Sequence, residues 1–123
     1  MAGSSGIEIV VRDCAPGRLL AWLSEVAGPL GAATDAGSAA AYPSRLGPVV
    51  VQPGAGGLGS ASVWFNAASL PWASDAACAR QASRALGCPV LCDPGPEYPG
   101  VAPESSVLLE VSAAGERLVT ADA

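Results

Sequence analysis

The side chains that could do chemistry in this chain are four cysteines, eleven carboxylates and six arginines, because histidine and lysine are both absent. Without an imidazole there is no Ser-His-Asp or Cys-His relay and no HExxH zinc site. Without an ε-amine there is no Schiff-base nucleophile and no P-loop cation for a bound phosphate. The residue types therefore indicate no catalytic residue and no cofactor, and they favour a function other than catalysis.

Residues 54–59 read Gly-Ala-Gly-Gly-Leu-Gly, which has the spacing of the GxGxxG dinucleotide loop. In that loop the third glycine opens a helix, and the N-terminal N–H groups of the helix hold the pyrophosphate. Residues 60–65 have the alternating pattern of a strand instead. A flexible hairpin turn is therefore favoured over a nucleotide site.

The spacing of the cysteines matches that of known catalytic or metal sites only partly. Cys78 and Arg84 are spaced C-x5-R, but a thiolate phosphatase needs its cysteine at a helix N-terminus, and Cys78 falls inside a predicted helix. The four cysteines could converge on zinc, but the C-x3-C spacing of Cys88 and Cys92 is not that of a zinc knuckle, so small core residues are favoured. Because no secretory signal precedes the first predicted strand, we expect reduced, metal-free thiols in the cytoplasm.

The composition is that of one domain with a real core, because half of the 123 residues are apolar and only 14% are charged. We expect residues 7–123 to form this domain, and residues 1–6 to be either a flexible N-terminus or an addition that is not native. The net charge of −5 would repel a phosphate backbone, so no nucleic-acid partner is predicted. No apolar run approaches the ~20 residues of a membrane span. An acidic surface is compatible with a basic protein partner.

The periodicity of the apolar residues predicts the fold. Helical stripes cover Pro16–Ala27 and Asp75–Leu86, and residues 31–42 are predicted to be a loop. Strands are predicted at residues 7–11, 49–51, 61–67, 90–92, 107–111 and 117–120, with the second and third paired as a hairpin. This β-α-β-β-α-β order with a terminal hairpin fits an α+β two-layer sandwich, in which both helices cover one face of a mainly antiparallel sheet.

The first candidate binding surface is the acidic, proline-rich loop after residue 92. Its three prolines stiffen the backbone and so reduce the entropy lost on binding. The candidate contact residues at this end of the sheet are Trp72, Asp93, Glu97, Tyr98 and Glu104. The alternative is that the loop only connects two strands through solvent.

The second candidate surface is the sheet face opposite the helices. Trp64 alternates with Val63 and Phe65, so it points away from the helices if Phe65 points toward them. The same alternation places further residues on this outer face, namely Glu8, Val10, Arg12, Asn66, Leu108 and Glu110. An exposed apolar patch rimmed by charge is typical of an interface, and cover by the terminal hairpin or a loop is the alternative.

The stretch from Trp72 to Pro99, with Asp75, Cys78 and Cys92 at its centre, resembles small uncharacterised proteins of high-GC bacteria, and this resemblance implies no activity. In size and acidity the chain is also similar to the immunity proteins of bacterial polymorphic toxins. That resemblance implies a non-enzymatic cytoplasmic factor that occludes a basic toxin domain. The alternative is a small enzyme or ligand sensor that uses a cysteine or carboxylate near Trp72 and Asp93. Self-association as a homodimer stays open.

Overall fold

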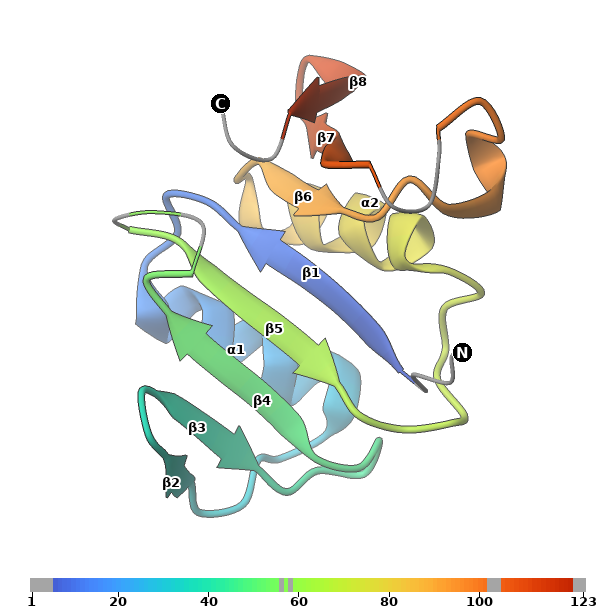
Figure 1. Cartoon of the computed structure of the whole chain (residues 1–123). Coiled ribbons are helices and arrows are strands. Elements are labelled where there is room, and N and C mark those ends of the chain that lie inside the picture. The colour runs from blue at the N-terminus through green and yellow to red at the C-terminus, as the bar shows by residue number, and fades with distance from the viewer. Residues whose placement is uncertain (1–5, 56, 58, 102–104, 121–123) are drawn as a thin grey trace.

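The computed structural model describes residues 6–55, 57, 59–101 and 105–120, which form two α-helices and eight strands. Figure 1 shows how these elements are arranged. The helices are α1 (Pro16–Ala27) and α2 (Asp75–Leu86). The strands are β1 (Ile7–Val11), β2 (Thr34–Ala36), β3 (Ala39–Tyr42), β4 (Val49–Pro53), β5 (Ala61–Phe65), β6 (Val90–Cys92), β7 (Val107–Ser112) and β8 (Gly115–Thr120). A short 3-10 helix, η1 (Gly95–Glu97), follows β6.

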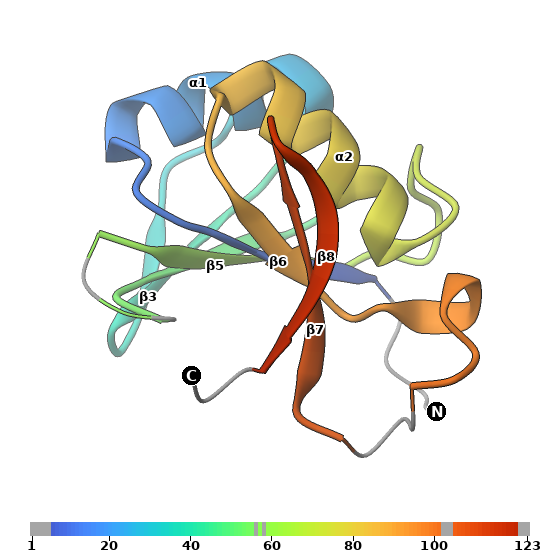
Figure 2. The same ribbon diagram turned by 90° about the horizontal axis from the view of Figure 1, so that it is seen from above.

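The strands of the described residues form one antiparallel sheet in the order β2-β3-β4-β5-β1-β6-β7-β8. β1 lies between β5 and β6, so Ile9 pairs with both Val63 and Cys92. Figure 2 shows both helices on the same face of the sheet, and the opposite face is turned toward the viewer in Figure 1. The predicted α+β fold with an antiparallel sheet is confirmed, and the arrangement fits a two-layer sandwich.

The helix boundaries follow from local signals in the sequence. α1 begins at Pro16, whose fixed φ suits a first helical position. α2 begins after Ser74, whose Oγ accepts a hydrogen bond from the Ala77 N–H at 3.1 Å, and it ends at Gly87 in the left-handed conformation with φ 68°. Neither described helix is long and apolar enough to cross a membrane.

The segment predicted as a loop at residues 31–42 contains the hairpin β2–β3. Gly37, with φ 70°, forms the turn, and β3 pairs with β4 through Ala40 opposite Val51 and Tyr42 opposite Val49. The side chains of β3 are mostly alanines of intermediate burial, so no alternation of apolar and polar residues is visible in the sequence. Backbone pairing with β4, which no local pattern reports, therefore decides this conformation.

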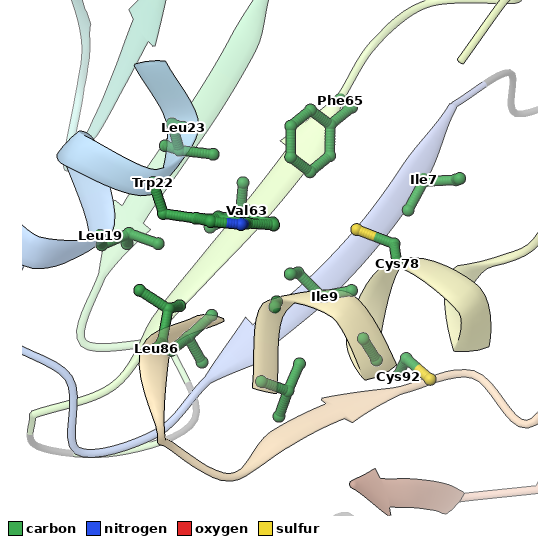
Figure 3. Close-up of a cluster of buried hydrophobic side chains, with 14 of the residues drawn as sticks. Ile7, Ile9, Leu19, Trp22, Leu23, Val63, Phe65, Cys78, Leu86 and Cys92 are labelled. Carbon is green, nitrogen blue, oxygen red and sulfur yellow. The ribbon is translucent and has the colours of Figure 1, made fainter. Parts of the chain in front are cut away.

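The core between the helices and the sheet is centred on three aromatic rings. The Phe65 ring lies 4.9 Å from the Trp72 ring and 6.3 Å from the Trp22 ring, measured between ring centroids. Figure 3 shows Trp22 of α1 reaching over Val63, with Cys78 of α2 beside the strands. These contacts join both helices to the central strands, so we expect the aromatic cluster to dominate stability.

Trp72 was predicted to be a surface contact residue, and the structure places it in the core instead. Its side chain is 8% exposed, and its indole N–H donates to Gln81 Oε1 at 2.6 Å. The bulky apolar ring gains more from burial against Phe65 than from exposure, and the hydrogen bond satisfies its one polar atom. Most of the Trp72 side chain therefore packs in the core, and its predicted role in partner binding stays a prediction.

Candidate functional site

The open face of the sheet carries Trp64 at its centre. Trp64 lies opposite Glu8 on β1 and opposite Val50 on β4, and it is 36% exposed. Its neighbours along the strand, Val63 and Phe65, are fully buried on the helical side. The alternation expected from the sequence is present, so a large aromatic surface faces away from the helices.

A depression of about 600 Å³ lies on this face beside Trp64. Its apolar lining includes Val10, Trp64 and Leu108. Its acidic lining consists of Glu8, Asp75 and Asp93. Figure 2 shows the β7–β8 hairpin running steeply relative to β5 and extending past the sheet on the open side. Leu108 of β7 lines the depression from this hairpin. We call the region the Trp64 depression.

The Trp64 depression joins two surfaces that the sequence presented as separate. Asp93 directly follows β6, and Cys92 at the end of β6 pairs with Ile9 of β1, so Asp93 comes to lie near Glu8. Asp75 enters from the first turn of α2 and was not predicted as a site residue. Its position beside the end of β1 depends on how α2 packs on the sheet. This packing cannot be predicted from the spacing of residues in the sequence.

The carboxyl group of Asp75 is half-buried in the depression. Burial raises its pKa to about 6, and the nearby charges of Asp93 and Glu8 add to this effect, whereas the backbone N–H of Glu8 lowers the pKa. One carboxylate oxygen of Asp93, Oδ1, accepts a hydrogen bond from the Gly95 N–H at 2.8 Å. The depression therefore gathers negative charge in a partly desolvated place.

Asp75 should make stability depend on pH. Its pKa is higher in the folded chain than in the unfolded chain, so its contribution to the free energy of unfolding falls as pH rises from about 4 to 6. Asp75→Asn should remove this fall. Because the side chain is only half-buried, we expect the free energy of unfolding of the variant to rise by about 1 kcal/mol relative to that of the parent between pH 4 and 6. Urea unfolding at each pH measures this difference. The exposed Glu25→Gln is the control, and a gain from Asp75→Asn that does not change with pH would contradict the assignment.

The acidic loop is held by an ion-pair network with α2 and β8. The Arg80 guanidinium donates to Glu97 Oε1 and to Glu116 Oε2, both at 2.7 Å. Tyr98 donates its hydroxyl to Glu116 Oε1 at 3.3 Å. The hydrogen bonds from Arg80 hold the pKa of Glu97 and of Glu116 below the usual range. Glu97 and Tyr98 are therefore committed to internal partners, and predicted Glu104 lies outside the described residues.

Glu110 on the open face also has an internal partner. Arg117 Nε donates to Glu110 Oε1 at 2.6 Å, and the two residues are opposite each other on β7 and β8. Among the described residues, the ion pairs formed by carboxylates are those of Glu97, Glu110 and Glu116. The acids of the Trp64 depression, in contrast, have no such pair in the described part of the chain.

The cysteines are unpaired thiols, three of them buried. Burial raises the pKa of Cys92 to about 12 and moves that of Cys78 further above its ordinary value. Burial, and then contact with Cys88, raises the pKa of Cys14 to about 11. Thiols that stay protonated at neutral pH are poor nucleophiles, so the alternative of cysteine chemistry near Asp93 gains no support. Within the described ranges no three Cys, Asp or Glu groups are placed to hold a metal ion.

Cys78 should act through packing alone. It is fully buried on α2 and faces Ile7 and Ile9 (Figure 3), so Cys78→Ser should lower the free energy of unfolding by about 1–3 kcal/mol by burying a hydroxyl in an apolar place. Chemical denaturation measures this loss. Cys14→Ser, at a half-buried loop position, is the control and should cost less. An equal cost at both positions would show that the burial of Cys78 does not matter.

A second cavity, of about 350 Å³, lies where α1 begins above β4 and β5. Its lining is mostly apolar and includes Leu19, Leu20 and Tyr42, with the Cys14 thiol and Ser60 as polar groups. Gly54 and Gly59 of the GxGxxG segment also line it, but Gly59 leads into strand β5 and not into a helix. The described residues of the segment, 54, 55, 57 and 59, therefore lie in the connection between β4 and β5.

Comparison of the chain with protein-family models, with curated proteins and with solved structures gives no match. No relative's function is therefore carried over to this chain.

Proposed function

We propose that this chain is a non-enzymatic protein-binding factor that uses the open sheet face around Trp64, and most concretely an immunity protein that occludes a basic toxin domain. The single observation that supports the proposal best is an exposed tryptophan in a depression with uncompensated carboxylates. Binding energy in interfaces is concentrated in buried aromatic anchors, with tryptophan among the most enriched. Carboxylates around such an anchor select a basic partner and speed its association.

The open face supports this proposal better than the acidic loop does. Glu97, which would have been a main charge of that loop, already binds Arg80. A partner that used Glu97 would have to break an existing ion pair, whereas Glu8 and Asp93 carry no such pair in the described residues. The net charge of −5 adds a long-range attraction for a basic surface.

Co-expression with the product of the neighbouring gene tests the proposal. We expect a complex that stays together in size-exclusion chromatography, and we expect the chain to suppress any growth defect that the neighbouring product causes. A neighbouring product that neither binds the chain nor harms the cell would count against the immunity function. A stable complex with a product that does not harm the cell would support protein binding but would contradict the neutralisation of a toxin.

The second cavity favours one alternative function, the binding of a small apolar ligand. A volume of about 350 Å³ falls in the range of small-molecule sites, and Tyr42 offers one polar group for orientation. Thermal shift with a panel of small apolar compounds separates the two functions. Stabilisation that Leu20→Trp abolishes and Trp64→Ala leaves intact would favour the ligand sensor, because Leu20 lines the second cavity and does not line the Trp64 depression.

A further inference from the structure

The wall of the Trp64 depression is an aromatic surface that is kept accessible. The Trp64 side chain is 36% exposed and lies opposite Glu8. Gly6 approaches its edge so closely that a Cβ on Gly6 would lie 3.1 Å from Trp64 Nε1 and 2.2 Å from the Phe65 carbonyl oxygen. A side chain at position 6 would therefore clash with this carbonyl oxygen and crowd the indole, and the φ of 109° at Gly6 also favours glycine.

Three carboxylates surround this wall and come from three different elements. Glu8 belongs to β1, Asp75 begins α2, and Asp93 follows β6. No arginine lines the depression in the described part of the chain. The repulsion among these groups contributes to the raised pKa of Asp75, so a bound cation would relieve an unfavourable interaction that the fold maintains.

The chemistry of the lining selects the kind of cation. A metal ion would use only the carboxylate oxygens and leave the indole and the apolar side chains of Val10 and Leu108 without a role. A guanidinium is planar, stacks on an aromatic face and donates hydrogen bonds in several directions, while its alkyl stem packs on apolar surface. An arginine side chain therefore matches every part of the lining.

We propose that the Trp64 depression receives an arginine side chain of the partner, with the guanidinium stacked on Trp64 and its N–H groups donating to Glu8, Asp75 and Asp93. This inference rests on the proposed function, because it names the group by which a basic partner is recognised. It also explains why these three acids form no ion pair with an arginine in the described residues, whereas Glu97, Glu110 and Glu116 each do.

Arginine binding should depend on pH through Asp75. The groups that face Asp75 are Glu8 from β1, Asp93 and Cys92 at the end of β6, and Cys78 on α2 itself. Burial keeps both thiols protonated, so the carboxylates carry the charge at neutral pH. Protonation of Asp75 removes one of them, and affinity should therefore be lower at pH 5 than at pH 7.5.

Nuclear magnetic resonance of the full chain with a short peptide tests the inference without the partner. The probe is acetyl-Leu-Arg-Leu-amide, and its control has citrulline, which keeps the shape and lacks the charge, in place of arginine. The indole N–H signal of Trp64 is followed, and Trp22 and Trp72 are buried internal references. We expect a saturable shift of the Trp64 signal with roughly five- to thirtyfold weaker binding of the citrulline peptide.

Matched variants test two of the three acidic groups. Asp75→Asn and Asp93→Asn should each lower the affinity for the arginine peptide. The asparagine at position 93 can still accept a hydrogen bond from the Gly95 N–H. Glu25→Gln, an exposed carboxylate on α1, should change nothing. Equal affinity for the arginine and citrulline peptides, tighter binding of a lysine peptide, or no shift of Trp64 at all would overturn the inference.

The two failures can be told apart. If the peptide does not bind but the neighbouring gene product does, the arginine pocket is wrong and the protein-binding function stands. If the peptide binds as expected but the neighbouring product does not, the pocket stands and the assignment of that partner is wrong.

Discussion

Replacing Phe65 with alanine is expected to lower the free energy of unfolding by about 3–5 kcal/mol, the largest effect of any single substitution that we predict. Phe65 is fully buried and contacts both Trp22 and Trp72, and its strand pairs with β1 and β4 on either side. Removing the ring leaves a cavity that two rigid indoles cannot fill, so the cost of the cavity adds to the lost burial. Urea denaturation of the two proteins measures the difference.

Leu118→Ala is the control for Phe65→Ala. Leu118 is also a large apolar residue in a strand, but it is 44% exposed on the edge strand β8. Its truncation should change the free energy of unfolding by no more than about 0.5 kcal/mol. Similar losses for both variants would mean that the aromatic cluster is not the centre of the core.

Reversing the charges of Glu8 and Asp93 together is expected to weaken partner binding by about thirtyfold to several thousandfold, since losing a close charge pair at an interface typically costs about 2–5 kcal/mol. In Glu8→Arg with Asp93→Arg, two guanidiniums would occupy the region that is to receive a basic group. Both side chains are exposed, so the melting temperature should change little. Calorimetric titration with the purified partner gives the affinity.

Glu97→Gln distinguishes the Trp64 depression from the acidic loop. Glu97 binds Arg80 at 2.7 Å, so its carboxylate should contribute little to a partner, and the variant should bind as the parent does. If Glu97→Gln weakens binding as much as the double reversal at Glu8 and Asp93, the loop is the binding surface, and the site that we propose on the open face is wrong.

The sequence was sufficient to predict the elements that carry a strong local pattern. The stripe with Leu19 and Leu23 predicts α1, and Ser74 and Gly87 mark both ends of α2. The β2–β3 hairpin was missed because its small side chains show no period and its conformation depends on pairing with β4. Local patterns report burial well, but they do not report which strand lies beside which.

The candidate site was predictable to the same extent. The outward position of Trp64 follows from simple alternation with Val63 and Phe65. The approach of Asp75 and Asp93 to Trp64 depends on β6 pairing with β1 and on the packing of α2, neither of which leaves a signal in the spacing of residues. The burial of Trp72 was not predictable for a related reason: it precedes α2 in an irregular segment, where no period shows which way a side chain points.

The affinity of Trp64→Ala for the purified partner tests the central claim most directly, because the claim is that the open sheet face binds through this side chain. Calorimetric titration should show a loss of about 2 kcal/mol or more, which is a roughly thirtyfold weaker dissociation constant. Leu118→Ala, the other large exposed apolar residue of the described chain, should bind like the parent. Equal affinity of Trp64→Ala and the parent, with both folded by circular dichroism, would contradict the account.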